Sequence, residues 1–217
     1  MNSKEFVEEL ERSNQEILAR MGPEDDPHTS CKVDLPALLR IALKNELEAS
    51  ELAARWMPST PELDVELGLA RQVGDEAKHY RLLEARYFEL AGKREEFDPR
   101  AGGYSTLFEY LTCLPTSVER LAAGQFTREA LAQRRNEMFI EYLIQIGDTV
   151  TAGIYQEIIQ PDEAFHHELG RSMLLKYATT PEPQEASREA CRKTLQIADK
   201  LRAGAIAKTG IYQIPGC

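Results

Sequence analysis

The sequence contains the same five-residue pattern, Asp-Glu-Ala-x-His, at residues 75–79 and again at residues 162–166. In each copy the Glu and the His are three residues apart, so on an α-helix they project from the same face. Apolar residues flank both copies at helical spacing, which predicts that this face is buried. Buried charges are costly unless they are paired or bind a metal. We therefore expect two helices that face each other across a shared polar centre.

Strand patterns are nearly absent, and apolar residues recur at helical spacing along most of the chain. The pattern predicts an all-α fold in which short clusters of Pro, Gly, Ser and Thr end the helices. Helices are expected at about 4–21, 35–57, 60–91, 105–113, 116–146, 149–177 and 184–207. The long segments within about 35–177 are predicted to form a four-helix bundle. Additional helices are expected at the N-terminus, in the central crossover and at the C-terminus, all in one domain.

Several predicted helix starts carry capping signals. Asp34 is a candidate N-cap residue, because Pro36 follows in the first turn. Two pairs have the spacing of a capping box: Ser59 with Glu62, and Thr116 with Glu119.

Pro161 lies inside the predicted helix 149–177, where it removes a backbone donor and costs about 3 kcal/mol unless it is accommodated. Two interpretations remain open. The proline either kinks the helix without further consequence, or it distorts the helix so that Glu163 points into the centre and space opens beside it.

The charge, the hydropathy and the cysteines of the sequence restrict its expected binding partners and cellular location. With 26 Lys and Arg against 36 Asp and Glu, the net charge of −10 disfavours nucleic acid and anionic membranes as partners. No apolar run approaches the roughly 20 residues that span a bilayer, and the N-terminus lacks the apolar region of a secretory signal. The cysteines are far apart and form no C-x-x-C motif, which favours a reduced, cytoplasmic protein: Cys31, Cys113, Cys191 and Cys217.

A metal centre in such a bundle also needs one carboxylate from each of the other two long helices. Glu46 shares the apolar stripe of its predicted helix and is preferred over Glu48 and Glu51. Glu129 shares a face with Phe126 and is preferred on the later helix. The alternatives there are Glu119, which is better used as a cap, Glu137 and Glu141.

The remaining histidines and a run of arginines are interpreted as structural. His167 points about 100° away from His166 on a helix, so it is expected at the surface or behind the ligands. His28 lies in a polar loop. Three arginines are predicted to form a solvated charged face: Arg128, Arg134 and Arg135.

With these two glutamates the motifs read Glu46 … Asp75-Glu76-x-x-His79 and Glu129 … Asp162-Glu163-x-x-His166. This pattern resembles the ferritin-like di-iron carboxylate proteins. The doubled Asp-Glu-x-x-His is most similar to their oxygen-activating branch, which includes bacterial multicomponent monooxygenases and the small subunit of ribonucleotide reductase. The resemblance covers about residues 35–177 and implies a ferritin-like bundle.

The resemblance also implies roles for individual residues. One iron ion would be held by Glu46, Glu76 and His79, and the other by Glu129, Glu163 and His166, with one or two glutamates bridging. Asp75 and Asp162 would accept hydrogen bonds from the histidine N–H groups and so orient the rings. Two iron ions are expected, although manganese or a mixed Mn/Fe pair suits the same ligands.

The sequence departs from relatives of this branch at two positions. Leu83 stands where the reductase subunit carries its radical tyrosine, which disfavours a stored tyrosyl radical there. Gln133 stands where monooxygenases often place a threonine, so their route of proton delivery is not carried over. Rubrerythrins usually have a Cys-rich electron-transfer module, and this sequence has none.

Three functions follow as hypotheses. The first is a di-iron oxygenase or oxidase that uses O₂ on a small organic substrate in an apolar pocket. The second is a ferroxidase or peroxide scavenger, and the third is a non-catalytic helical interaction module. An organic-sized cavity beside the metals favours the first hypothesis, an accessible metal pair without a cavity favours the second, and absence of metal favours the third. The candidate pocket walls are Tyr80, Leu83, Phe126 and Ile159.

The expected partners are O₂, the substrate and an external electron donor. A donor is expected because the sequence contains no nucleotide-binding fingerprint and no iron–sulfur ligands. A homodimer is a further possibility, since the terminal helices can cover a face of the bundle.

Overall fold

The computed structural model describes residues 1–20, 34–91, 97–209 and 214–216, and within these residues it is all helical, without strands. The predicted all-α bundle is therefore confirmed. The α-helices are α1 (Ser3–Arg20), α2 (Leu35–Trp56), α3 (Leu63–Ala91), α4 (Thr106–Thr112), α5 (Ser117–Arg120), α6 (Glu129–Gln145), α7 (Thr149–Ile154), α8 (Gln160–Tyr177) and α9 (Pro181–Thr209). A 3₁₀ turn, η1 (Met57–Ser59), and two π-helical segments, η2 (Leu121–Arg128) and η3 (Tyr155–Ile159), join some of them. No helix in the described part of the chain has the length and apolar character needed to cross a membrane.

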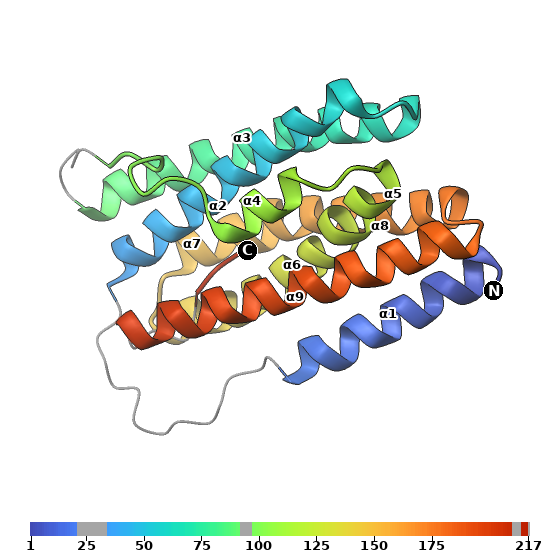
Figure 1. Cartoon of the computed structure of the whole chain (residues 1–217). Coiled ribbons are helices and arrows are strands. Elements are labelled where there is room, and N and C mark those ends of the chain that lie inside the picture. The colour runs from blue at the N-terminus through green and yellow to red at the C-terminus, as the bar shows by residue number, and fades with distance from the viewer. Residues whose placement is uncertain (21–33, 92–96, 210–213, 217) are drawn as a thin grey trace.

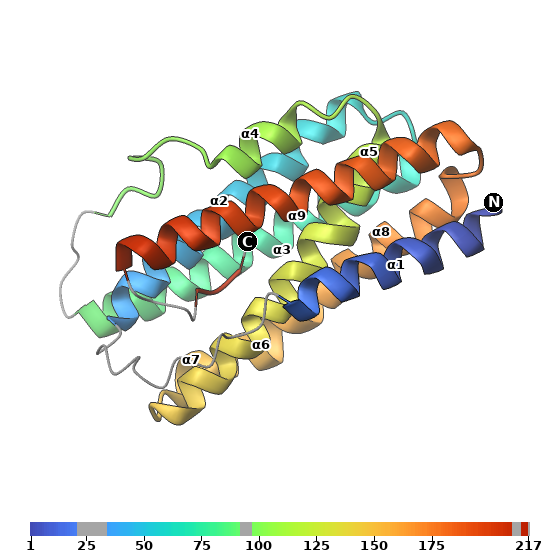
Figure 2. The same ribbon diagram turned by 60° about the horizontal axis from the view of Figure 1, so that its bottom comes forward.

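Four rods form the bundle (Figure 1). α2 and α3 pack against each other as one pair. The third rod runs through α5, η2 and α6 without a break, and the fourth runs through α7, η3 and α8. α8 packs against η2 and α6, which joins these two rods into a second pair. The terminal helices α1 and α9 run along one side of this bundle, as Figure 2 shows.

Two apolar cores fill the bundle at different heights. One gathers Trp56 of α2, Phe126 of η2 and residues of α1, α4 and α9. The other gathers Leu43 of α2, Tyr87 of α3 and Phe139 of α6. Along α2 and α3 the sequence passes from one core to the other through the stretch that carries the predicted ligands. The candidate site is therefore a buried polar layer between two apolar cores.

The predicted helix starts are partly correct. Thr116 and Glu119 form the expected capping box at the start of α5. Asp34 occupies the N-cap position of α2, although its side chain makes no capping hydrogen bond. The box predicted for Ser59 and Glu62 is wrong, because Ser59 extends the end of α2 as a 3₁₀ turn and donates to the Trp56 carbonyl. Glu62 instead accepts a hydrogen bond of 2.5 Å from the Ser117 hydroxyl.

Pro161 is accommodated within a continuous rod. It lies in the first turn of α8, directly after the π-helical η3. The rod continues through this junction, where the Gln160 N–H donates to the Tyr155 carbonyl five residues earlier, so the proline follows a widened π turn and not a regular α-helical one. The helical distortion near Pro161 is therefore a π turn that ends four residues before Glu163.

Candidate metal centre

All six predicted ligands meet in the polar layer, and they come from four rods. Glu46 comes from α2, Glu76 and His79 from α3, Glu129 from α6, and Glu163 and His166 from α8. They form two overlapping groups in which the ligand atoms lie within 4.8 Å of one another: Glu46, Glu76, His79 and Glu163, and then Glu76, Glu129, Glu163 and His166. Every member is buried, and Glu76 and Glu163 belong to both groups. The shared pair therefore lies where two adjacent cations would be bridged.

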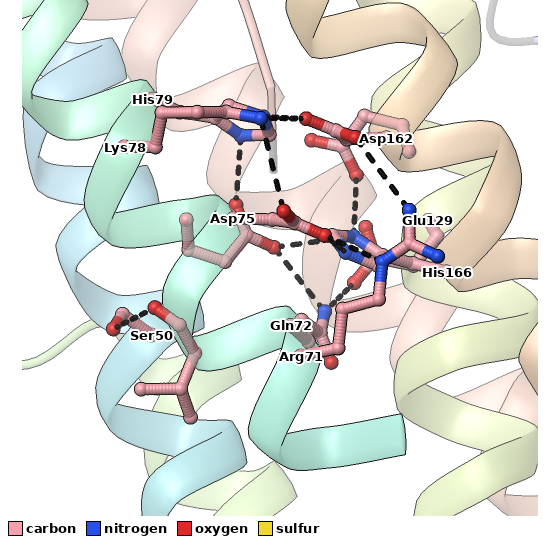
Figure 3. A network of polar contacts seen from close by, with 12 residues as sticks. Ser50, Arg71, Gln72, Asp75, Lys78, His79, Glu129, Asp162 and His166 are labelled. Carbon is pink, nitrogen blue, oxygen red and sulfur yellow. Dashed lines mark hydrogen bonds and ion pairs between the residues drawn. The ribbon is translucent and has the colours of Figure 1, made fainter. Parts of the chain in front are cut away.

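The histidine of each motif contacts the aspartate of the other motif (Figure 3). His79 Nε2 lies 3.0 Å from Asp162 Oδ2, and His166 Nε2 lies 3.2 Å from Asp75 Oδ2. Each ring then turns its Nδ1 toward the glutamates. His79 Nδ1 lies 3.2 Å from a Glu76 oxygen. Each histidine is thus oriented by the aspartate of the other motif, an arrangement that fixes the tautomer of a metal-binding imidazole.

Cations at the surface neutralise these aspartates. Lys78 Nζ lies 2.5 Å from Asp162, and Arg71 Nε lies 3.2 Å from Asp75. Partial burial alone would raise the pKa of Asp162, but hydrogen bonds from Lys78 and His79 hold it below its usual range. Asp162 therefore stays ionised as an acceptor for the His79 ring.

The buried charges shift one another strongly. Burial raises the pKa of Glu46 to about 7 and also raises that of Glu163, beside Glu129 and Glu76, well above its usual range. Burial would likewise raise the pKa of Glu76, but its hydrogen bond to His79 and the nearby His166 lower it to about 2. Burial opposes ionisation of His79, yet Glu46 and Glu76 raise its pKa to about 11. Without a cation, protons must supply the positive charge that this layer of carboxylates needs.

Three buried atoms of the second group have no hydrogen-bond partner among the described residues: Glu129 Oε2, Glu163 Oε2 and His166 Nδ1. An unsatisfied buried polar atom costs about 1–3 kcal/mol, so three in one place require an explanation. A divalent cation between them would satisfy all three. Carboxylate oxygen and imidazole nitrogen suit iron and manganese, so this donor set fits such a metal.

Two buried glutamines beside the candidate ligands are not among the predicted site residues: Gln72 and Gln125. Gln72 Nε2 donates to Glu129 Oε1 at 2.8 Å and to Glu76 Oε1 at 3.2 Å. Gln125 Nε2 in turn donates to Gln72 Oε1 at 2.8 Å. Gln72 lies one helical turn before Glu76, so the stripe of inward-facing residues contained a signal for it.

The prediction of a solvated arginine face is wrong for two of its three members. Arg128 is only 6% exposed, and its Nη1 lies 3.0 Å from Glu129 Oε1. Arg135 is 9% exposed and donates to the carbonyls of Ala198 and Gly216. Arg134 is exposed at the surface and pairs with Glu137. Arg128 ends the π-helical segment η2 and lies directly before Glu129.

The alternative carboxylates and the other histidines have different roles. Glu48 accepts hydrogen bonds from Ser105, and Glu51 pairs with Arg100. His167 lies 2.8 Å from the Phe126 carbonyl and stacks on that ring, outside both groups. His28 lies outside the described residues.

A pocket of about 280 Å³ reaches the first group between α2 and α3. Glu46 and Glu76 line it, together with Leu47, Ser50, Ala77, Tyr80, Arg81, Pro99 and Arg100. Of the predicted wall residues, only Tyr80 lines this pocket. The structure places Leu83 and Ile159 in one apolar core and Phe126 in the other. The pocket is therefore of mixed polarity, with two arginines at its wall, and it is not apolar as expected.

Comparison of the chain with protein-family models, with curated proteins and with solved structures finds no match. The class of the protein is thus defined by what its own residues build: an all-α bundle with a buried carboxylate–histidine cluster compatible with a metal pair.

Proposed function

We propose that the protein is a non-haem di-iron oxygenase or oxidase that uses O₂ on a small organic substrate. The observation that carries the proposal is the meeting of four buried glutamates and two histidines, each ring oriented by an aspartate, beside a pocket. Glu46, Glu76 and His79 would hold one metal, and Glu129, Glu163 and His166 the other. Four carboxylates balance the charge of two divalent ions, and manganese is an alternative to iron.

Two ferrous ions would supply two electrons for the reduction of O₂, and the protein residues would control position and charge. For a hydroxylation the reaction balances as RH + O₂ + 2e⁻ + 2H⁺ → ROH + H₂O. Asp75 and Asp162 keep the imidazole rings in place, with Nδ1 directed at the glutamates. Repeated turnover then requires an external electron donor.

The pocket supports an organic substrate over the ferroxidase alternative. Glu46 and Glu76 are among the residues that line it, so a bound molecule would lie beside the first metal position. Its volume of about 280 Å³ is near the lower limit for small-molecule sites, which restricts the substrate to a compact one. Tyr80 and the two arginines offer polar contacts on the wall.

A single-turnover experiment tests the proposal. The chain is loaded with Fe(II) without oxygen, mixed with ¹⁸O₂ and a panel of small phenols, amines and aromatic acids, and analysed by mass spectrometry. We expect one labelled or oxidised product, which is lost in Ala77→Trp, where the pocket is filled. Ala70→Trp, at an exposed position of the same helix, is the matched control and should retain the product.

Other outcomes of this experiment separate the hypotheses. Oxidation of two Fe(II) ions per chain with no product from any probe would contradict the oxygenase proposal and favour a ferroxidase. A chain that takes up no metal would contradict both and leave a helical interaction module.

A further inference from the structure

Glu129 is held through one oxygen only. Its Oε1 accepts hydrogen bonds from Gln72 at 2.8 Å and from Arg128 at 3.0 Å. Its Oε2 is buried without a hydrogen-bond partner among the described residues, and Glu129 belongs to the second group of candidate ligands. The two oxygens of one carboxylate therefore have different surroundings: two donors occupy Oε1, and Oε2 is left without a hydrogen bond and available to a cation.

The orientation of Gln72 is set by a second buried amide. Gln125 donates to Gln72 Oε1, which leaves the Gln72 amide N–H groups to face the carboxylates. Both glutamines are 2% exposed. The donor to Glu129 is therefore held in place by packing and by hydrogen bonding on both sides.

Arg128 is an unexpected neighbour for a cation site. Its guanidinium is always charged and is buried beside the carboxylate that would hold a divalent metal. The like charges repel each other, so Arg128 weakens cation binding at this position compared with a neutral residue. In the other half of the centre the matching carboxylate, Glu46, is hydrogen-bonded to His79.

We propose that Gln72 and Arg128 are positioning residues that hold Glu129 as a single-oxygen ligand through Oε2. The inference rests on the proposed metal centre. Because Gln72 and Arg128 both donate to Oε1, Glu129 cannot offer both oxygens to a metal. The metal position beside His166 then has one ligand atom fewer than it would have with Glu129 bound through both oxygens. The two metal positions are then unequal, with the weaker affinity and the lower coordination number beside Glu129.

Cobalt(II) tests this arrangement, because its visible absorption depends on coordination number and does not require turnover. The wild-type chain and its variants are titrated with Co(II) without oxygen, by calorimetry and by absorption. In Arg128→Met we expect the Kd of the weaker equivalent to fall at least about tenfold, since a repelling charge is removed. The Co(II) absorption should also weaken, because Oε1 loses one of its two hydrogen bonds and gains a free lone pair with which it can bind the metal.

Two further variants complete the test. Arg128→Lys keeps the charge and should keep a Kd close to wild type, while Gln72→Leu should shift the absorption in the same direction as Arg128→Met. Arg134→Met is the matched control, since Arg134 is exposed six residues further along the same rod and pairs with Glu137. Thermal unfolding of each variant shows whether it folds.

Wild-type Kd values and spectra in both Arg128→Met and Gln72→Leu would overturn the inference while the metal centre stands. If Arg128→Met fails to fold, the Co(II) Kd values and absorption spectra of Gln72→Leu and Arg128→Lys test the inference instead. A wild-type chain that binds no Co(II) and no Fe(II) would instead refute the proposed function, and this inference with it.

Discussion

At the scale of single residues, the exchange of aspartates makes each motif depend on the other. Asp75 is four residues before His79 but orients His166, and Asp162 orients His79. A change in either aspartate should therefore affect the histidine of the opposite helix.

We predict that Asp162→Asn weakens divalent-metal binding about 10- to 100-fold, because an amide no longer presents a charged acceptor to His79 Nε2. Metal affinity measured by calorimetry checks this. Asp199→Asn, an exposed aspartate on α9, is the control and should bind as wild type. Unchanged affinity in Asp162→Asn would show that the Asp162–His79 contact does not support a metal ligand.

The convergence of Glu76, His79, Glu163 and His166 could be predicted from sequence because a helical spacing of three places Glu and His on one face. The exchange of Asp75 and Asp162 could not, since it depends on how two distant helices pack. Arg128 was misassigned for a different reason. It was interpreted as solvated because a run of charges usually is, whereas it lies at the end of a π-helical segment and is buried beside Glu129.

At the scale of elements, π-helical segments stand before the ligands of both rods in the second pair. η2 ends directly before Glu129, and η3 ends four residues before Glu163. Such segments are often found at functional sites. The presence of helices could be predicted from the apolar periodicity of the sequence. The π-helical segments could not, because a pattern with a period of 3.6 residues does not distinguish them from regular α-helix. A close helix contact accompanies them, because a Cβ at Gly170 of α8 would lie 2.6 Å from the Phe126 backbone nitrogen.

We predict that Gly170→Ala lowers the free energy of unfolding by about 1–3 kcal/mol, because the η2 backbone cannot give way as a flexible side chain can. Urea denaturation measures the change. Gly74→Ala is the control: its helical position is open, and the substitution should stabilise the chain by about 0.5–1 kcal/mol. Equal effects of the two substitutions would argue against the close approach of α8 and η2.

The start of α7 should depend on pH through Asp148. This residue caps the helix by accepting from the Thr151 N–H at 3.0 Å, and it pairs with Arg86 at 2.9 Å. Burial would raise its pKa, but these hydrogen bonds hold the pKa below its usual range. The stabilisation is therefore present above the unfolded-state pKa and is lost as the pH falls through the lower folded-state pKa.

We predict that Asp148→Ala costs about 1–2 kcal/mol at pH 7 and that this cost shrinks as the pH falls below about 4. Asp148→Asn should lose less, because asparagine also caps helices. Urea denaturation at several pH values checks both statements. A cost for Asp148→Ala that stays constant down to pH 2 would contradict the assigned role.

At the scale of the whole molecule, the bundle contains a layer of buried ionisable residues between two apolar cores. Four glutamates and two histidines occupy a layer that hydrophobic residues would fill at lower cost. Three buried atoms in this layer have no hydrogen-bond partner among the described residues, which is compatible with a bound cation. The all-α bundle could be predicted from sequence, whereas the pocket could not, because its walls include residues 99 and 100 of the crossover, which carry no helical periodicity.

The most direct test is the iron content per chain after loading with Fe(II) without oxygen. We compare the wild type with the double variant Glu76→Ala/His166→Ala and with Glu89→Ala, an exposed glutamate on the same helix as Glu76. The account predicts two iron ions in the wild type and in Glu89→Ala, and loss of both in the double variant, with all three chains folded by circular dichroism. A folded wild-type chain that binds no iron and no manganese would contradict it.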